Sequence, residues 1–406
     1  SVTDRRRATR MGRPFRVLRV EARCVAVARA SRVPRRGWAL LERPGDGYGS
    51  GNGGSAPAPN GGAREAGYTV SMTISRYVQE SMKQSSWIRK MFTEGQRLKE
   101  ELGADQVADL SLGNPVQEPP AALFDRMREL AALDPHGYHR YMSNSGLRST
   151  RTAVAAYLEK NTGVPYEAEN IIMTVGAGGA LNVLFKGILD PGDEVICLTP
   201  FFVEYRFYIT NHGGEMVLVP TDERFRPDPK AIQEAITPRT RAVVVNSPNN
   251  PSGVVYDRAD YDALAEVKHE ASKLQGRPVW IVSDERYRGI TYDGVEVPWP
   301  VNHYRDTLHV TSFSKDLGLP GERIGYIGIN PACNFADGLR DAFTFTNRTL
   351  GFVNAPAFQQ RLVEGLLDVT VDMAGYTAKR ALLLDALEKA GYEVVKPYGA
   401  FYIFPK

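Results

Sequence analysis

The sequence predicts an α/β fold in which helices cover a mainly parallel sheet. From about Leu123 to Ile329, short apolar runs of strand-forming residues alternate with amphipathic helical stretches, the order expected of parallel strands joined by helices. Several of these runs end in glycine or in polar residues, as strands do where a parallel sheet binds its ligands. The 406 residues exceed what one hydrophobic core usually supports, so we expect a large domain with a smaller companion.

The overall composition is that of an ordinary globular protein, with 43% hydrophobic and 24% charged residues. No apolar run reaches the roughly 18 to 20 residues that span a bilayer, so we expect no membrane association. The net charge of +3 is too small to predict nucleic acid as a partner. Cys24, Cys197 and Cys333 fit neither a disulfide framework nor a metal-binding knuckle, which favours a reducing, cytoplasmic location.

The first 71 residues differ in composition from the rest. The segment Ser1–Ser71 contains many arginines and no lysine, and Gly45–Gly62 consists mostly of Gly, Ser, Pro and Asn. Such a segment buries too little apolar surface to fold, so we expect it to be a dispensable, disordered leader. It could be a targeting peptide, an arginine-rich arm for nucleic acid, or the product of a translation start misplaced upstream of Met72. We favour the last interpretation.

An amphipathic helix is expected from Ser86 to Leu102, because apolar residues recur at helical spacing and the pattern breaks at Gly103. The apolar face consists of Trp87, Ile88, Met91, Phe92 and Leu98.

Five apolar runs carry different chemical groups at their carboxyl ends. The runs and their continuations are Ile171–Val175 before Gly176-Ala177-Gly178-Gly179, Glu194–Thr199 before Pro200-Phe201-Phe202, Ala242–Val245 before Asn246–Pro251, Val279–Val282 before Ser283-Asp284-Glu285-Arg286-Tyr287, and His309–Phe313 before Ser314-Lys315. A helical pattern begins at Ala180, after the glycines. Because the carboxyl ends of parallel strands share one edge of a sheet, we expect these groups to converge on one site.

Each group taken alone also has a purely structural interpretation. A glycine-rich turn serves tight packing as readily as anion binding by free backbone N–H groups. Asp284 could cap a helix, Phe202 could belong to the core, and Lys315 could be a solvated surface residue. The order of all these groups along the chain is the more informative observation.

That order resembles the class I and II aminotransferases, from about Met72 to Lys406. The strongest likeness is Ser312-Phe313-Ser314-Lys315 followed by Pro320-Gly321-Glu322-Arg323-Ile324-Gly325-Tyr326, which is similar to the family's lysine motif and its downstream arginine. The Ser-Pro-Asn-Asn-Pro-Ser-Gly turn that ends at Gly253 and the Ser-Asp-Glu-x-Tyr element that ends at Tyr287 come next. Weaker agreement comes from Ser111-Leu112-Gly113-Asn114-Pro115 and from Tyr141 before Gly146-Leu147-Arg148.

The resemblance implies the aspartate aminotransferase fold (fold type I) and a division into domains. Residues 119–371 would form the large cofactor-binding domain. Residues 72–118 and 372–406 would form a smaller α+β domain, incomplete at the C-terminus.

The resemblance also implies pyridoxal 5'-phosphate (PLP) as the cofactor. Lys315 would bind its aldehyde as a Schiff base and then act as the base at the substrate Cα, helped by burial and nearby positive charge that lower its pKa. Asp284 would keep the ring nitrogen protonated. Asn250 and Tyr287 would hydrogen-bond to the ring hydroxyl, and Phe202 would stack on the ring. Lys315, Asp284 and Tyr287 are the expected catalytic residues.

By the same resemblance, a cradle of donors would bind the phosphate. Its members would be the backbone N–H groups of Ala177 and Gly178, the side chains of Ser312, Ser314 and Arg323, and Tyr141, which would reach the phosphate of the neighbouring subunit. A homodimer is therefore implied. Substrate would contact Gly113 and Asn250.

The sequence departs from the family at two places. It stops at Gly399–Lys406, which looks like a strand of the family's small domain, whereas the family continues to an arginine that binds the substrate α-carboxylate. We therefore expect a fragment or an incomplete aminotransferase, whose own activity stays open. Arg286 stands where relatives often have a smaller or apolar residue.

The favoured function is transfer of an amino group between an L-amino acid, such as aspartate or alanine, and a 2-oxo acid. A PLP-dependent lyase or decarboxylase on the same fold is one alternative. Another is an aminotransferase-like sensor domain of a transcription regulator, although residues 1–71 show no helix-turn-helix pattern. The sequence does not identify the amino donor.

Overall fold

The computed structural model describes residues 74–84, 86–107, 113–133 and 136–406. The expected leader, residues 1–71, therefore lies outside the described residues, and so do Ser111 and Leu112 of the predicted 111–115 motif. None of the described helices is long and apolar enough to cross a membrane.

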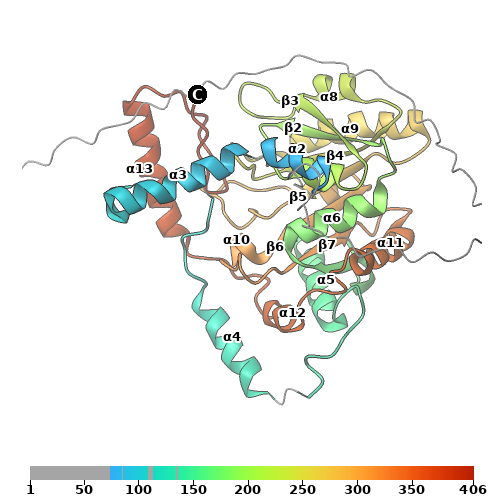
Figure 1. Cartoon of the computed structure of the whole chain (residues 1–406). Helices are drawn as coiled ribbons and strands as arrows, with labels where there is room; N and C mark the ends of the chain where they lie inside the picture. The colour runs from blue at the N-terminus through green and yellow to red at the C-terminus, as the bar shows by residue number, and fades with distance from the viewer. Residues whose placement is uncertain (1–73, 85, 108–112, 134–135) are drawn as a thin grey trace, which may run out of the picture. The chain divides into compact units, whose positions relative to one another are not determined.

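In the described residues, seven strands form one sheet (Figure 1). The strands are β1 Ile171–Thr174, β2 Glu194–Thr199, β3 Glu215–Pro220, β4 Thr240–Asn246, β5 Trp280–Asp284, β6 Thr307–Ser312 and β7 Gly325–Ile329. Their order is β1-β7-β6-β5-β4-β2-β3. Neighbours from β3 to β6 are parallel, whereas β7 runs antiparallel to β1 and β6. The prediction of a mainly parallel sheet is confirmed.

Helices connect and flank these strands. The helices are α2 Arg76–Gln84, α3 Ser86–Leu102, α4 Ala121–Ala132, α5 Arg148–Thr162, α6 Gly176–Ile188, α7 Tyr205–Thr210, α8 Pro229–Ala235, α9 Arg258–Gln275, α10 Phe313–Asp316, α11 Ala336–Thr349, α12 Ala357–Val363 and α13 Met373–Lys389. Short 3-10 turns lie at Ala104–Gln106, Ala168–Asn170 and Pro300–Asn302. Local chemistry sets the ends, as in α9, where the Asp257 carboxylate accepts from the Asp260 backbone N–H over 3.1 Å and Gly276 ends the helix with a φ of 65°.

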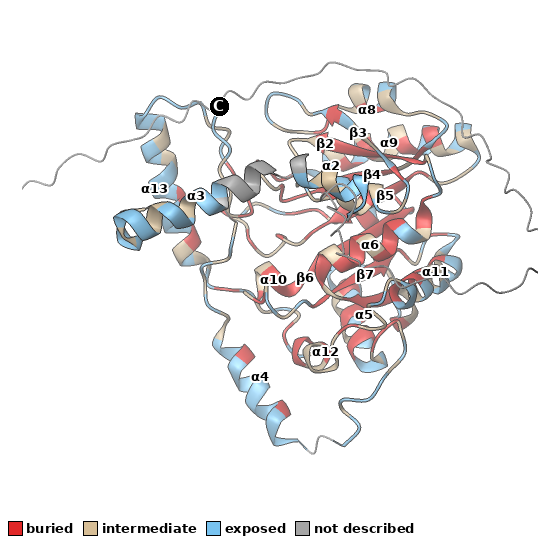
Figure 2. Cartoon of the chain, in the orientation of Figure 1, coloured by how far each residue is buried: buried red, intermediate tan, exposed pale blue. Residues whose placement is uncertain are grey.

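Alternate residues of the central strands enter hydrophobic cores on opposite faces of the sheet. In β4, Ala242 and Val244 pack in the core that contains α6, α7 and α11, whereas Val243 and Val245 pack in the core that contains α8 and α9. Strands buried on both faces are apolar at nearly every position, which is why they were predictable as continuous runs. Figure 2 shows α6 and the strands other than β3 as mostly buried, while α4 and α13 are largely exposed.

The predicted helix from Ser86 to Leu102 is confirmed as α3, with the same bounds. Met91, which was placed on its apolar face, is nevertheless 57% exposed. The expected helix start at Ala180 is wrong, because α6 begins at Gly176 and the glycines form its first turn. Gly176 has a φ of 68°, a conformation that favours glycine, so the chain turns from β1 into the helix at this residue.

The C-terminal residues do not form the expected strand. From Gly399 onward only isolated bridges occur in the described chain, between Thr291 and Gly399 and between Val394 and Pro405. A strand requires a continuous ladder of such pairs. The chain from Arg76 to Lys406 forms one compact unit, and its division at residues 118/119 and 371/372 stays a prediction.

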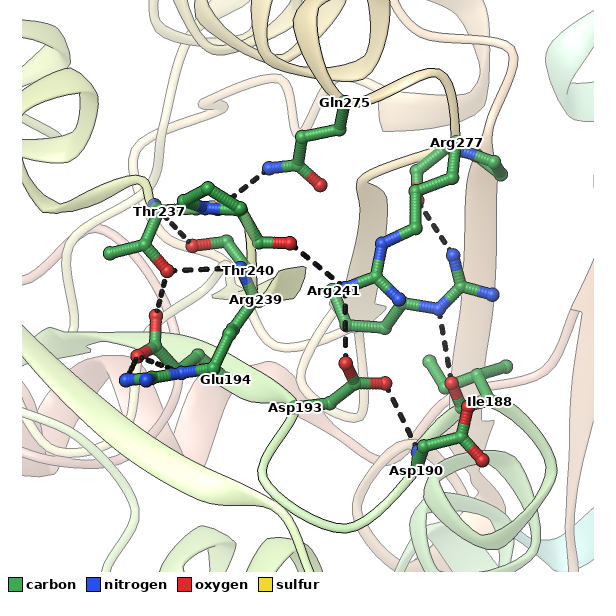
Figure 3. A network of polar contacts seen from close by, with 12 residues as sticks. Ile188, Asp190, Asp193, Glu194, Thr237, Arg239, Thr240, Arg241, Gln275 and Arg277 are labelled. Carbon is green, nitrogen blue, oxygen red and sulfur yellow. Dashed lines mark hydrogen bonds and ion pairs between the residues drawn. The ribbon is translucent and has the colours of Figure 1, made fainter.

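The edge of the sheet where β2 and β4 begin is held by a network of polar contacts (Figure 3). Glu194 accepts a hydrogen bond from the Thr237 hydroxyl over 2.6 Å and another from Arg239 Nε over 3.0 Å. Arg241 Nε donates to the Ile188 carbonyl over 3.0 Å. These contacts include none of the predicted site residues, so this edge serves the fold.

Candidate active site

The carboxyl ends of β4, β5 and β6 lie next to one another at the other edge. Asn246, the last residue of β4, pairs with Asp284, the last residue of β5, and Asp284 pairs with Val310 of β6. The Asn246 amide nitrogen donates to the Asp284 carbonyl over 2.8 Å, and its amide oxygen accepts from the Asn250 backbone N–H over 2.8 Å. Asn246 therefore fixes the turn after β4 against the end of β5.

The Asp284 side chain is completely buried, with an exposed fraction of 0%. The Tyr205 hydroxyl donates to Asp284 Oδ2 over 2.6 Å, and Arg286 Nε donates to Oδ1 over 2.9 Å. Arg286 Nη2 donates to Oδ2 as well. Burial acts to lower the pKa of Arg286, but the Asp284 carboxylate outweighs it and holds this pKa well above its usual range. The buried carboxylate therefore has a cation directly against it.

The Arg286 guanidinium also lies over an aromatic ring. Its central carbon is 4.6 Å from the centroid of the Phe202 ring. The Tyr205 ring packs edge-to-face against Phe202, with centroids 5.5 Å apart and planes at 83°. The guanidinium thus combines a cation–π contact with an ion pair to a buried carboxylate.

Lys315 lies in α10, within one helical turn of the end of β6. Burial, together with the positive charges of Arg286 and Arg323, lowers the pKa of Lys315 to about 8. Its Nζ donates to the Gly113 carbonyl over 3.3 Å and lies 5.2 Å from the centroid of the Phe401 ring. About a tenth of this amine is therefore neutral, and so nucleophilic, near neutral pH.

Two tyrosine hydroxyls meet beside Lys315. Tyr287 and Tyr402 are hydrogen-bonded through their hydroxyls over 2.9 Å, and the Asn250 amide nitrogen donates to the Tyr287 hydroxyl over 3.4 Å. Burial, followed by the neighbouring Tyr402, raises the pKa of Tyr287 well above its usual range, so it stays protonated. A Cβ atom at Gly113 would lie 2.1 Å from the Tyr402 hydroxyl oxygen, so only glycine lets the backbone approach so closely.

The N-terminus of α6 forms a cradle of donors. A Cβ atom at Gly176 would lie 3.0 Å from Arg323 Nη2, and one at Gly178 would lie 3.1 Å from the Tyr208 hydroxyl oxygen. The first turn of this helix, which includes Ala177, has backbone N–H groups that no helical carbonyl accepts. The helix dipole, a guanidinium and a phenol therefore favour an anion here.

A second buried carboxylate, Glu285, directly follows Asp284 and is 1% exposed. It is hydrogen-bonded to His309 Nδ1 over 2.9 Å, accepts from the Ser283 hydroxyl over 2.8 Å, and accepts from Arg288 Nε over 2.6 Å. Burial acts to raise the pKa of Glu285, but Arg288 and His309 outweigh it and lower the pKa to about 2. Glu285 is therefore charged and fully paired.

The structure brings most of the predicted site residues together through these contacts. Ser312 and Ser314, both buried, flank Lys315 in the motif. Tyr141 is the exception, because it is 90% exposed and makes no contact that joins it to this site among the described residues.

Sequence reasoning missed Tyr205, Tyr208 and Tyr402. Tyr205 and Tyr208 lie three and six residues after Phe202, so a short helix there would have placed both on one face. Tyr402 was noted within the C-terminal segment, but nothing in that pattern pointed it toward Lys315.

The chain matches a family of known proteins over most of its length. The family model described as aminotransferase class I and II matches residues 105–406. The chain belongs to this family. It is therefore a transferase enzyme with the aspartate aminotransferase fold, as the sequence motifs favoured.

Individual relatives extend over most of the chain. An aminotransferase crystal structure from Eubacterium rectale is 37% identical, covers 82% of this chain and 85% of its own, and gives a TM-score of 0.80. A Thermus thermophilus aspartate aminotransferase solved with maleate is 32% identical, covers 81% and 84%, and gives a TM-score of 0.69. A probable aspartate/prephenate aminotransferase of Thermus aquaticus is 36% identical over 310 residues, which are 74% of this chain and 77% of the relative.

Proposed function

We propose that this chain uses PLP to move an amino group between an L-amino acid, such as aspartate or alanine, and a 2-oxo acid. The observation that carries the proposal is the partly buried Lys315 amine, whose pKa is lowered to about 8. This amine shares one site with the buried Asp284 carboxylate and with the anion cradle at the start of α6. An amine nucleophile, a carboxylate and an anion cradle suit an aldehyde, a protonated ring nitrogen and a phosphate.

The residues fit the phosphate and the ring of this cofactor. The backbone N–H groups of Ala177 and Gly178 and the Arg323 guanidinium would bind the phosphate, together with the Ser312 and Ser314 hydroxyls. Asp284 fits the ring nitrogen, since it already binds a flat cation. Phe202 would stack on the ring, while Asn250 and Tyr287 would hydrogen-bond to the ring hydroxyl.

When bound, PLP supplies a sink for the electron pair left at the substrate Cα. The Lys315 amine would hold the cofactor through its aldehyde, and once substrate had released it, Nζ would be the base that accepts the substrate Cα proton and gives it back. A lysine with an ordinary pKa would be almost fully protonated near neutral pH and could not do so. The Asp284 carboxylate would keep the ring nitrogen protonated.

Relatives support a dicarboxylic substrate. The Thermus aquaticus relative is named for aspartate and prephenate, and the Thermus thermophilus structure contains maleate. We propose aspartate as one amino donor, with Gly113 and Asn250 at the substrate carboxylate. We also propose a homodimer, since the exposed Tyr141 side chain is free to enter a neighbouring subunit's phosphate site.

Borohydride reduction tests the proposal directly. The chain incubated with PLP and then reduced should carry the pyridoxyl group on Lys315 by peptide mapping, and Lys315→Ala should carry none. Label on another lysine, or no label, would overturn the assignment. Aspartate should convert the unreduced bound cofactor to its amino form, which distinguishes an aminotransferase from a lyase.

A further inference from the structure

Arg286 is a residue of the site that the proposed reaction does not use. It stands between Glu285 and Tyr287 in the chain, and its side chain is only 11% exposed. Its guanidinium pairs with the buried Asp284 carboxylate on one side and lies 4.6 Å above the Phe202 ring on another. These are the two groups assigned above to the cofactor ring.

A protonated pyridine ring and a guanidinium can make the same kinds of contact at this site. Both are flat, both carry a delocalised positive charge, and both donate N–H to a carboxylate while a face rests on an aromatic ring. Asp284 Oδ1 accepts from Arg286 Nε, and Oδ2 accepts from Arg286 Nη2 and from the Tyr205 hydroxyl. Two flat cations cannot both lie against this carboxylate and this face of Phe202.

We propose, on the basis of the function proposed above, that Arg286 fills the ring site of the cofactor-free enzyme, so that cofactor binding is an exchange in which the ring displaces the guanidinium. Arg286 is thus a positioning residue. It keeps the buried Asp284 charge paired until the cofactor arrives, and it weakens cofactor binding in return.

The contacts of Arg286 make this exchange feasible. Among the described residues, its side chain donates only to Asp284. Arg288 differs, because it also donates to the carbonyls of Val297 and Pro298, over 2.6 and 2.8 Å. Displacing Arg286 therefore breaks two hydrogen bonds to Asp284 and one ring contact. The protonated ring would restore the positive charge, one N–H bond to the carboxylate and the contact with Phe202.

The exchange has a measurable consequence for affinity. When a ligand binds only the open form, its apparent dissociation constant is the intrinsic one divided by the open fraction. If the guanidinium fills the site in about nine-tenths of the cofactor-free molecules, removing it tightens ring binding about tenfold.

Pyridoxine 5'-phosphate is the appropriate probe, because it has the ring and phosphate but no aldehyde to react with Lys315. Its dissociation constant should fall about tenfold in Arg286→Met relative to the parent chain. Arg206→Met is the matched control, since Arg206 is an exposed arginine on α7 next to Tyr205, and it should leave the constant unchanged. An equal or larger constant in Arg286→Met would overturn the inference.

A second variant and a thermal-melting measurement distinguish the exchange from a general loss of folding. Arg286→Gln keeps a flat polar group without the charge and should tighten binding less. In Arg286→Met, the cofactor-free protein should melt earlier than the parent, because Asp284 is left without its cation, while the PLP-bound forms should melt together. Equal losses in both forms would show that Arg286 is merely structural and would contradict the exchange.

The two proposals fail in different ways. If PLP labels Lys315 in both the parent and Arg286→Met while the pyridoxine 5'-phosphate constants are equal, the exchange is wrong and the proposed function stands. If PLP labels Lys315 in neither protein, the proposed function is wrong and the exchange fails with it.

Discussion

Asp284 and Glu285 are consecutive buried carboxylates, and each is paired with an arginine that lies over an aromatic ring. Arg286 lies 4.6 Å from the Phe202 centroid, and Arg288 lies 3.5 Å from the Trp299 centroid. Because successive residues at a strand end point to opposite sides, the first pair faces the candidate active site and the second faces away from it.

The two pairs differ in how completely they are satisfied. Glu285 is hydrogen-bonded to Ser283 and His309 as well as to Arg288, and Arg288 also donates to two backbone carbonyls. Among the described residues, the Arg286 side chain donates to Asp284 alone. We therefore expect the Glu285–Arg288 pair to stabilise the fold, since all its donors have partners. The Asp284–Arg286 pair is instead suited to binding, since a ligand can replace the arginine.

The largest effect is expected from Asp284→Ala. The ring nitrogen would lose the carboxylate that keeps it protonated, so kcat for aspartate transamination should fall at least about a thousandfold. Lys315 should still be labelled after borohydride reduction, which would show that the cofactor is bound. A kcat within tenfold of the parent, measured with excess PLP, would remove Asp284 from the mechanism.

Glu285→Ala should affect stability instead. Removing one partner of a buried ion pair leaves the other uncompensated, so the free energy of unfolding in urea should fall by about 3 to 5 kcal/mol. Glu285→Gln, which can still accept hydrogen bonds, should lose less. If Glu285→Ala keeps full stability but loses turnover, the division of roles between the two carboxylates is wrong.

Asp316 differs from both carboxylates, because among the described residues its side chain forms no ion pair and accepts only the Gly289 N–H, over 3.2 Å. Burial raises the pKa of Asp316 to about 7, against smaller opposing effects of that hydrogen bond and of Arg288. The folded protein therefore holds a proton that the unfolded chain has already released above pH of about 4.

The sign of the effect follows from this difference. The contribution of Asp316 to stability is complete below pH of about 4 and is lost as the pH rises through about 7. Asp316→Asn cannot ionise, so it should match the parent at pH of about 4 and exceed its unfolding free energy by about 4 kcal/mol at pH of about 8. A constant difference between the two proteins across this range would contradict the raised pKa.

The sheet was predictable because its central strands are buried on both faces. The predicted run Glu194–Thr199 is β2 with the same bounds, and Ala242–Val245 lies inside β4. An apolar run carries no direction, however, so the sequence did not predict that β7 is antiparallel to its neighbours. The helix start at Gly176 was missed because glycine is a poor helix former, although its free N–H groups suit a first turn.

The sequence motifs predicted which residues of the candidate site lie close together, but not the direction of every side chain. Lys315, Asp284 and Asn250 came together because each lies at the end of a strand of one sheet or just after it. The pairing of Arg286 with Asp284 was not predictable, since a long side chain takes its direction from tertiary packing. The role proposed for Tyr141 depends on a second copy of the chain and stays a prediction.

Tyr205 gives the smallest expected effect and tests how much of the Asp284 environment comes from a neutral donor. Its hydroxyl donates to Asp284 Oδ2 over 2.6 Å. Burial, followed by the Asp284 charge, raises the pKa of Tyr205 well above its usual range, so the hydroxyl remains a donor at any working pH. Tyr205→Phe should lower the free energy of unfolding by about 1 kcal/mol, because Arg286 still holds both carboxylate oxygens.

Tyr166→Phe is the matched control for that variant. Tyr166 is also buried, but its hydroxyl has no hydrogen-bond partner among the described residues, so its removal should cost nothing. The difference between the two variants in urea denaturation isolates the bond to Asp284. In the PLP-bound enzyme, where the ring nitrogen replaces the guanidinium, Tyr205→Phe should lower kcat by no more than about tenfold. Equal stability losses in the two variants would show that the Tyr205 hydroxyl does not stabilise the Asp284 carboxylate, and that Arg286 is the partner that matters before the cofactor binds.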